Sequence, residues 1–192
     1  MARSDELPVL GEMLARAFFD DPVSVWSCPP SGLREAVLRR FFTVRLRQVA
    51  AKGEVWVVGE RASAALWLPP DRWRTTVGED LALAASQLHP RLLWRLPLVA
   101  WGLLGVERVH PHAPAHWYLA VLGTEPETQG RGFGSAALAP VLERCDRDGI
   151  GAYLESSKER NIPFYARHGF RVVDTLKLPR GPVIYPMWRD PG

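Results

Sequence analysis

The sequence predicts a mixed α/β fold, with one sheet flanked by helices. Three observations lead to this prediction. Strand-like and helix-like segments alternate along the second half of the chain, the apolar run 117–124 leads through a glycine-rich turn into a helical pattern, and residues 1–70 hold two helical patterns followed by two strands. With 192 residues and 47% hydrophobic content the chain can build one substantial core, so we expect a single domain over 1–192.

The chain begins with two helical patterns. Apolar residues recur at three- and four-residue steps from Leu7 to Phe18, which predicts an amphipathic helix that stops before Asp20-Asp21-Pro22. A second pattern runs from about Ser31, which can cap its start, to Ala51, with Gly53 just past its end. We expect one side of this second helix to carry Leu33, Val37, Phe41, Val44 and Gln48.

A strand pair and a helical segment follow. Residues Glu54–Gly59 and Ala62–Leu68 read as two strands joined by a tight turn, and Pro69-Pro70 ends the second because proline cannot donate to a strand ladder. The segment 71–114 is rich in tryptophan and leucine, carries no strand signal and resembles an insertion. Within it we expect helical stretches near Leu81–Leu88 and Arg91–Gly105.

The remaining elements alternate around the glycine-rich turn. We expect them to be a strand at Trp117–Thr124, a helix at Gly134–Arg147, a strand at Ala152–Glu155, a short helix at Asn161–His168 and two strands at Phe170–Leu176 and Val183–Trp188.

The turn Gln129-Gly130-Arg131-Gly132-Phe133-Gly134-Ser135 carries the clearest functional signal. Its backbone N–H groups lie at the positive end of a helix, an arrangement that suits an anion such as a diphosphate. A Walker A loop needs Gly-Lys-Ser/Thr at its end, and a dinucleotide fingerprint needs Gly-x-Gly-x-x-Gly; neither spacing is present. The loop therefore predicts a phosphorylated cofactor, and the spacing disfavours a nucleotide-binding protein with affinity for ATP or NAD.

The pattern Gln129-x-x-Gly132-x-Gly134 resembles the coenzyme A loop of the GNAT superfamily of acyl-CoA-dependent N-acyltransferases. Further blocks similar to that superfamily follow in its order, and the second half is most similar to puromycin N-acetyltransferase-like members. The likeness covers 111–192, whereas the first half is only loosely alike. The blocks are Tyr153-Leu154-Glu155-Ser156-Ser157, Asn161-Ile162-Pro163-Phe164-Tyr165 and His168-Gly169-Phe170.

The resemblance implies a central mixed, mostly antiparallel twisted sheet that splays at a site for acetyl-CoA. It implies that backbone groups of Leu122 and Thr124 pair with the pantetheine arm. Gln129 would tie the loop to the preceding strand, and Arg131 either adds charge near the phosphates or is a solvated surface arginine. The cofactor residues implied in this way are Leu122, Thr124, Gln129, Gly130, Arg131, Gly132, Phe133, Gly134, Ser135, Asn161 and Tyr165.

The same resemblance marks Tyr165 as the general acid, since a phenol with a reference pKa of about 10 is protonated at neutral pH and can donate to a departing thiolate. Asn161 shares a helical face with Tyr165; it positions the pantetheine arm or Tyr165, or it caps the helix. Cys145 falls on the apolar side of a helix and is expected in the core. We therefore expect direct transfer in a ternary complex, without a covalent enzyme intermediate.

The attacking amine must be neutral, so a base is needed. Glu155 is the best side chain by chemistry, and Tyr118 stands where some superfamily members carry a glutamate. His116 has a suitable reference pKa, although a histidine just before a strand is more often structural. His110-Pro111-His112 resembles a metal pair, but nothing nearby in the sequence completes a ligand set, so no metal is expected.

Composition and segment lengths argue against a nucleic-acid partner, an oxidising compartment and a membrane span. The net charge of +3 comes from 24 basic and 21 interspersed acidic residues, without a basic run, so no nucleic acid is expected. Two isolated cysteines and the charged start of the chain indicate a reducing cytoplasm. The apolar run Leu92–Val106 is interrupted by Arg95 and Pro97 and is shorter than the roughly 20 residues a membrane span needs.

The resemblance places acceptor binding in the first half, which is rich in aromatic residues. We expect most of these in the core and the rest around a small amphipathic amine, aminonucleosides being the first to try. Asp20 and Asp21 either attract the cationic nitrogen or form a turn before Pro22. The alternatives are a non-catalytic acyl-CoA-binding module and an acetyltransferase for protein or peptide amines, and the chain is expected to be a monomer or homodimer. The aromatic residues are Phe18, Phe19, Trp26, Phe41, Phe42, Trp73, Trp94 and Trp101.

Overall fold

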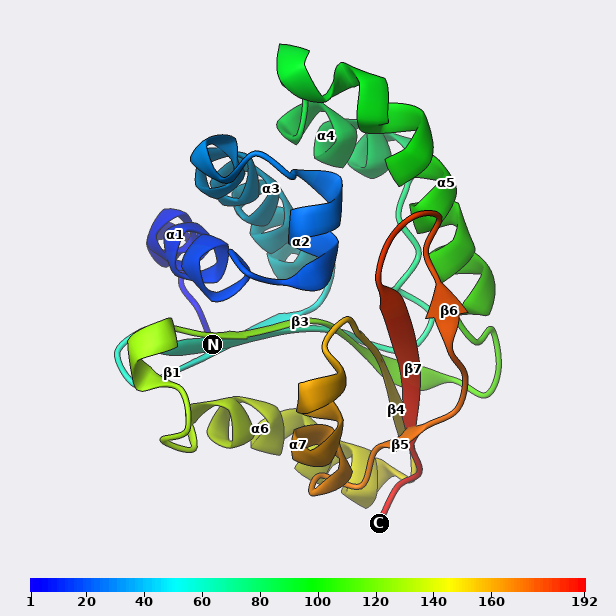
Figure 1. Cartoon of the computed structure of the whole chain (residues 1–192). Coiled ribbons are helices and arrows are strands. Elements are labelled where there is room, and N and C mark those ends of the chain that lie inside the picture. The colour runs from blue at the N-terminus through cyan, green and yellow to red at the C-terminus, as the bar shows by residue number, and fades with distance from the viewer.

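The computed structural model describes all 192 residues and places a seven-stranded sheet between two layers of helices (Figure 1). The α-helices are α1 (Leu7–Ala17), α2 (Pro22–Ser27), α3 (Ser31–Lys52), α4 (Val77–Ser86), α5 (Leu96–Val109), α6 (Phe133–Asp148) and α7 (Ile162–Ala166). The 3-10 helices are η1 (Ser4–Glu6), η2 (Pro90–Arg95), η3 (Pro126–Thr128) and η4 (Glu159–Asn161). The strands are β1 (Glu54–Val58), β2 (Ser63–Leu68), β3 (His116–Thr124), β4 (Gly151–Ser156), β5 (Arg171–Val172), β6 (Leu176–Lys177) and β7 (Val183–Arg189).

The sheet is mixed and mostly antiparallel. Its strands follow the order β1-β2-β3-β4-β7-β5, with β6 paired to β7, and only β3 and β4 run parallel. A parallel pair needs a long crossover, and α6 supplies it between these two strands. Helices α1 to α5 lie on one side of the sheet and α6 and α7 on the other (Figure 1). The predicted fold class is confirmed.

The parallel pair separates after four residues. Pairing runs from His116 with Gly151 to Leu119 with Leu154, and the rest of β3 has no partner on the side that faces β4. Strand β4 continues for two residues that pair only with β7. The expected splay is therefore present, and it leaves residues 120–124 without a strand partner along one edge.

Two hydrophobic clusters cover the two faces of the sheet. On one face α1 and α3 pack against β1, β2 and β3, with Leu10, Leu14 and Leu46 fully buried. On the other face α6 packs against β2, β3 and β4, with Leu138 and Val141 fully buried. Both layers hold the sheet by apolar burial, the main favourable term in folding.

A β-bulge in β3 changes which residues share a face. Leu66 pairs with Val121 and Trp67 with Leu119, so Ala120 has no partner in β2. Strict alternation along an unbroken strand would put Leu122 and Thr124 on the same face as Tyr118. Beyond the bulge the faces switch: Val121 packs with α1 and α3, while Leu122 packs with the α6 cluster.

The helices of the first third differ from expectation in three ways. The short helix α2 was not predicted, because six residues are too few to show a period. Ser31 does not cap α3, whose N-cap is Pro30 and makes no side-chain cap bond. The buried face of α3 is also rotated by about one residue relative to the predicted face. Phe41 and Val44 are only half-buried, and the positions that face the core are Val37, Leu38, Phe42, Leu46 and Val49.

Three segments have other boundaries than predicted. Helix α4 starts at Val77 because Thr76 and Glu79 form a capping box, in which the Glu79 amide donates to Thr76 Oγ1 over 3.2 Å. Helix α5 runs on to Val109, four residues beyond the prediction. The predicted strand 170–176 is instead two short strands, β5 and β6, each paired with β7.

Candidate functional site

The glycine loop ends in a helix start with unpaired amides. Gly130 and Gly132 have φ of +77° and +84°, a left-handed backbone that side chains rarely adopt, and a Cβ at either would meet no protein atom within 4 Å. Gly132 is the N-cap of α6, and no side chain caps this end. The backbone N–H groups of residues 130–135 donate to no protein acceptor. Six such donors at the positive end of a 16-residue helix suit a phosphate group.

Side chains at both ends hold the loop in place. Gln129 Nε2 donates to the Thr124 carbonyl oxygen over 3.2 Å, which is the tie between loop and strand that the sequence led us to expect. Ser135 Oγ lies 2.9 Å from His168 Nε2. Burial lowers the pKa of His168, so a neutral imidazole faces the Ser135 hydroxyl at neutral pH.

The two bulky side chains of the loop lie in different surroundings. The Phe133 ring packs on Gly59 in the β1–β2 turn, since a Cβ on Gly59 would lie 2.6 Å from Phe133 Cε1. Arg131 is exposed and pairs with no carboxylate. Phe133 therefore offers the loop only its backbone.

The start of α6 faces the unpaired half of β3 and the short helix α7. A Cβ on Gly134 would lie 3.4 Å from Phe164 Cζ and 3.6 Å from Thr124 Oγ1. Because of the bulge, Leu122 and Thr124 lie on this same face. The structure thus brings the glycine loop, the free edge of β3 and α7 together.

Tyr165 is 8% exposed in this layer and packs against Phe164 and Phe170, with ring centroids 5.1 and 6.0 Å away. Its hydroxyl has no hydrogen-bond partner in the protein. Burial, together with the nearby Asp21 carboxylate, raises the pKa of Tyr165 above its usual range, so the phenol stays protonated. Asn161 is the N-cap of α7 but makes no side-chain cap bond, so the capping alternative does not hold.

Asp21 is engaged by the protein itself. Its Oδ1 accepts from the Val23 amide at 2.9 Å and caps α2, and its Oδ2 accepts from the Ser157 hydroxyl after β4. Asp21 is 4% exposed, whereas Asp20 is exposed. The structural alternative for Asp21 therefore holds, and it links the first helices to the end of β4.

Glu155 lies on the other face of β4. Leu154 packs in the α6 cluster, and the next residue, Glu155, points to the opposite side, where its side chain is 9% exposed. Tyr118 and Tyr153 are its neighbours on this face. Burial, with the Glu155 carboxylate adding to it, raises the pKa of both phenols above the usual value of 10, so both stay protonated.

Two histidines complete this buried group. His110 Nδ1 lies 3.2 Å from Glu155 Oε1, and His110 Nε2 lies 3.1 Å from His116 Nε2. His116 Nδ1 lies 2.8 Å from the Pro114 carbonyl oxygen, and burial lowers the pKa of His116. Sequence reasoning considered His110 only as half of a metal pair. No spacing rule relates it to Glu155, which is 45 positions away.

The site therefore has two halves on opposite faces of the splayed strands. The face with α6 and α7 carries the glycine loop and Tyr165, and the face with α1 to α5 carries Glu155, Tyr118 and the histidines. A protonated phenol on one face and a buried carboxylate on the other can serve as acid and base across the opening between β3 and β4.

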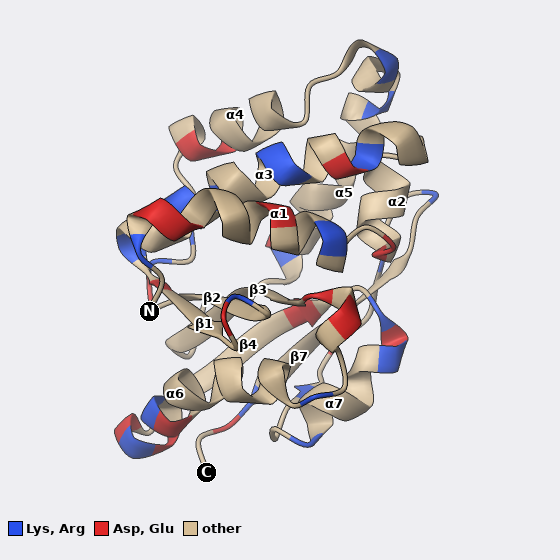
Figure 2. Cartoon of the chain, turned by 90° about the vertical axis from the view of Figure 1, so that its left-hand side faces the viewer, with Lys and Arg blue, Asp and Glu red and all other residues tan.

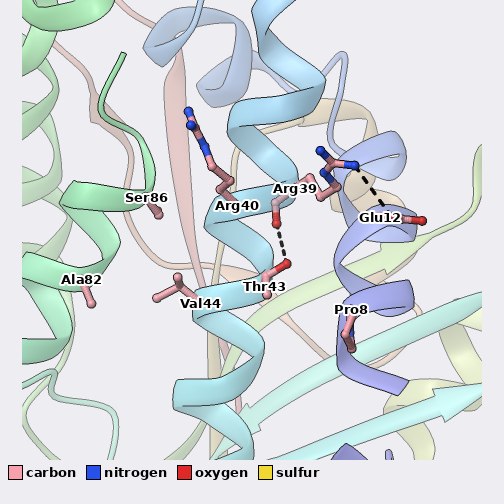
Figure 3. A pocket seen from close by; sticks show the side chains of 8 residues that line it. All are labelled: Pro8, Glu12, Arg39, Arg40, Thr43, Val44, Ala82 and Ser86. Atoms are coloured by element: carbon pink, nitrogen blue, oxygen red, sulfur yellow. Dashed lines mark hydrogen bonds and ion pairs between the residues drawn. The ribbon is translucent and has the colours of Figure 1, made fainter. Parts of the chain in front are cut away.

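A cavity of about 440 Å³ lies elsewhere, between α1, α3 and α4 (Figure 3). Its polar lining is already engaged: Arg39 lies 3.9 Å from Glu12, Thr43 donates to the Arg39 carbonyl oxygen over 2.7 Å, and Arg40 donates to the Leu88 carbonyl oxygen over 3.5 Å. None of its lining residues belongs to the glycine loop or the Glu155 group. We regard it as a surface groove between helices.

Charged residues of both signs are mixed in the view of Figure 2, and no helix is a candidate membrane span. Figure 2 shows Lys and Arg interspersed with Asp and Glu over both helical layers, with no face of a single sign in that view. None of the helices combines the length and the apolar character that crossing a membrane requires.

Comparison with known proteins identifies the family. The family model of the acetyltransferase (GNAT) family matches residues 60–170, more than half of the chain. An uncharacterised N-acetyltransferase of Schizosaccharomyces pombe is 28% identical over 178 residues, which cover 87% of this chain and 71% of that protein.

Solved structures share the fold. The histone acetyltransferase HPA2 and related acetyltransferase from Corynebacterium glutamicum superposes with a TM-score of 0.72 at 24% identity, over 100% of this chain and 94% of that one. The arylalkylamine N-acetyltransferase 2 of Aedes aegypti gives a TM-score of 0.63 at 9% identity, over 100% and 97%. At these identities the structures show the fold alone. Together with the family match, they lead to one conclusion: the chain belongs to the acetyltransferase (GNAT) family and is an acetyl-CoA-dependent N-acetyltransferase.

Proposed function

We propose that the chain moves the acetyl group of acetyl-CoA to the amine of a small amphipathic molecule, by direct attack in a ternary complex. One observation carries this proposal: the unpaired amides at the start of α6 open beside the free edge of β3, with a protonated phenol on one side of the sheet and a buried carboxylate on the other.

The residues present fit the cofactor. The N–H groups of residues 130–135 would hold the diphosphate, and the exposed Arg131 side chain is free to add charge. The unpaired edge of residues 120–124 would pair with the pantetheine arm, as one more strand does when it joins a sheet edge. Asn161, whose side chain caps nothing, is available to the same arm.

The acid and the base are assigned by their ionisation and position. Glu155 removes a proton from the acceptor ammonium, and the neutral nitrogen then attacks the thioester carbonyl carbon. The carbon–sulfur bond breaks, and Tyr165 gives its phenolic proton to the leaving thiolate. The acylated nitrogen loses its second proton to solvent as the amide forms, Glu155 releases the proton it took, and Tyr165 regains a proton from solvent. Tyr118 stays protonated beside Glu155, so we assign it as a hydrogen-bond donor to the carboxylate, not as the base.

The acceptor side favours an aromatic or otherwise amphipathic amine. Of the eight aromatic residues noted in the first half, Phe18 and Phe42 pack in the core 5.0 Å apart, Trp26 is buried, and Trp94 and Trp101 are exposed. Trp73, however, joins the tyrosines around the Glu155 group. Aromatic walls near a carboxylate suit a flat group that carries an amine, so puromycin-type aminonucleosides are the first acceptors to test.

A substrate panel tests the proposal. We would measure kcat/KM with acetyl-CoA for puromycin, an aryl-alkylamine, spermidine and a basic peptide, with products detected by mass. The proposal expects puromycin or the aryl-alkylamine to exceed the other two by at least about tenfold, since each buried apolar group contributes roughly 1–3 kcal/mol of discrimination. A preference for the peptide or spermidine refutes the small-amine proposal. Binding of acetyl-CoA without thiol release on any amine would point to a regulatory module.

We propose a reducing cytoplasm as the location, because Cys28 and Cys145 are both free and buried. We further propose that residues 1–192 act as one domain, a monomer or homodimer, with 71–114 as a helical insertion that contributes to the acceptor side.

A further inference from the structure

His110 is the buried polar residue that the proposed mechanism does not use. It is 4% exposed and stands at the C-cap of α5, outside the sheet strands that carry Tyr118 and Glu155. Both of its ring nitrogens have partners, namely Glu155 Oε1 at 3.2 Å and His116 Nε2 at 3.1 Å. The insertion thus delivers an imidazole directly onto the carboxylate assigned as the base.

The hydrogen-bond partners determine where the protons lie. A carbonyl oxygen can only accept, so His116 Nδ1, 2.8 Å from the Pro114 oxygen, carries a hydrogen. Burial keeps His116 neutral by lowering its pKa, so His116 Nε2 is an acceptor. His110 Nε2 must therefore donate to it.

One more proton then has to lie between His110 and Glu155. With Nε2 protonated, a neutral His110 would turn the lone pair of Nδ1 toward Glu155 Oε1. If Glu155 were an ionised carboxylate, no hydrogen would then lie between His110 Nδ1 and Glu155 Oε1. The contact is satisfied only if the pair shares a proton. The proton resides on His110 Nδ1, as an imidazolium beside a carboxylate, or on Glu155 as a neutral acid.

Two independent features favour the imidazolium. Trp73 stacks on the His110 ring at 3.8 Å and 22°, and Tyr118 and Tyr153 meet it in T-shaped contacts at 4.6 Å, so three aromatic rings surround it as in cation-binding cages. His110 also follows the last turn of a 14-residue helix, where a cation interacts favourably with the helix dipole.

We propose that His110 is held as an imidazolium and is a positioning residue that keeps the buried Glu155 ionised and oriented for the acceptor amine. This inference rests on the proposed function. Without the cation, a 9% exposed carboxylate in an aromatic surrounding would favour its neutral form, which cannot take a proton.

Other ionisable groups face this pair from each packed element. His116 and Tyr118 come from β3, and Tyr153 comes from β4; both phenols stay protonated, and His116 is neutral. The charged side chains whose fields reach this group are more distant: Arg45 on α3 acts on Tyr118, Asp71 on His116 and Asp174 on Tyr153. The direct partner that can carry a positive charge beside the carboxylate is therefore His110.

The first test is the pH dependence of His110→Gln on the best amine of the panel, with each rate divided by that of wild type at the same pH so that titration of the amine cancels. A cation within about 4–6 Å moves a carboxylate titration by about 1–3 pH units, so we expect the variant to lose about tenfold or more at pH 6 relative to its loss at pH 8.5. His112→Gln is the matched control, since His112 is exposed and contacts Trp73 and, over 2.9 Å, Arg74, but makes no hydrogen bond to Glu155 or His110. An equal loss at all pH values would overturn the proposal.

The second test needs no activity and so separates this inference from the proposed function. In ¹⁵N-labelled wild-type protein, with the His110 signals assigned by their absence in His110→Gln, we expect both ring nitrogens to carry hydrogen at pH 7. A neutral His110 with one protonated nitrogen at pH 7 would overturn the proposal. If His110→Gln does not fold, Gln variants of the other four histidines, His89, His112, His116 and His168, give the assignment by elimination.

Discussion

The two ends of α6 allow a sharp test of the cofactor site. Gly132 at the N-cap and Gly149 at the C-cap both have a left-handed backbone, with φ of +84° and +66°, and a Cβ at either meets no protein atom within 4 Å. An alanine in this conformation costs about 1–2 kcal/mol. For a chain of this size each kcal/mol lowers the Tm by about 2–4 °C, so we expect Gly132→Ala and Gly149→Ala to lose a similar 2–8 °C.

Only the Gly132 substitution is expected to affect the cofactor. A methyl group there enters the space in front of the free amides of residues 130–135 and weakens one or two hydrogen bonds to phosphate, worth about 1.5–3 kcal/mol each. We therefore expect acetyl-CoA to bind Gly132→Ala about 10- to 100-fold more weakly, and to bind Gly149→Ala as it binds wild type. Calorimetric titration gives both affinities, and thermal unfolding gives both stabilities. An unchanged affinity of Gly132→Ala, or an equal loss in both variants, refutes the assignment of the loop.

Three further outcomes follow from the same structure. Tyr165→Phe should lower kcat by about 100- to 10,000-fold with little change in acetyl-CoA affinity, and wild-type turnover would remove Tyr165 from the mechanism. Cys145→Ala should keep kcat within about twofold, because burial raises the pKa of this thiol to about 11 and direct transfer needs no thiolate; inactivation would argue for a covalent intermediate. The Gly192 amide and the Arg189 guanidinium lower the pKa of Asp146, so its contribution to stability is present above about pH 4 and is lost as pH falls through the lowered value. Since its side chain is 36% exposed we expect Asp146→Asn to cost under about 1 kcal/mol at pH 7 and progressively less as the pH falls through the lowered pKa of Asp146, as thermal unfolding over a series of acidic pH values would show.

The sequence by itself determined the parts whose signals are local. The first helix shows its period over 11 residues, β1 and β2 are bounded by turn residues, and the glycine loop marks the start of α6 within a few positions. The fold class followed from the alternation of these elements, and the bond from Gln129 to Thr124 links residues only five positions apart. Tyr165 and Glu155 remain predictions as acid and base, since their roles rest on chemistry that only kinetics can test.

The tertiary structure decided what depends on register and on long-range contact. The bulge at Ala120 arises from pairing with β2, and it moved Leu122 and Thr124 to the loop face against the rule of alternation. The buried stripe of α3 was set by packing on α1, because its own sequence has apolar residues on several sides. His110 and Glu155 contact each other although 45 positions and three elements, β3, η3 and α6, separate them in the sequence. Periodicity and spacing report only neighbours along the chain, so a buried contact between a helix end and a distant strand leaves no mark in the sequence.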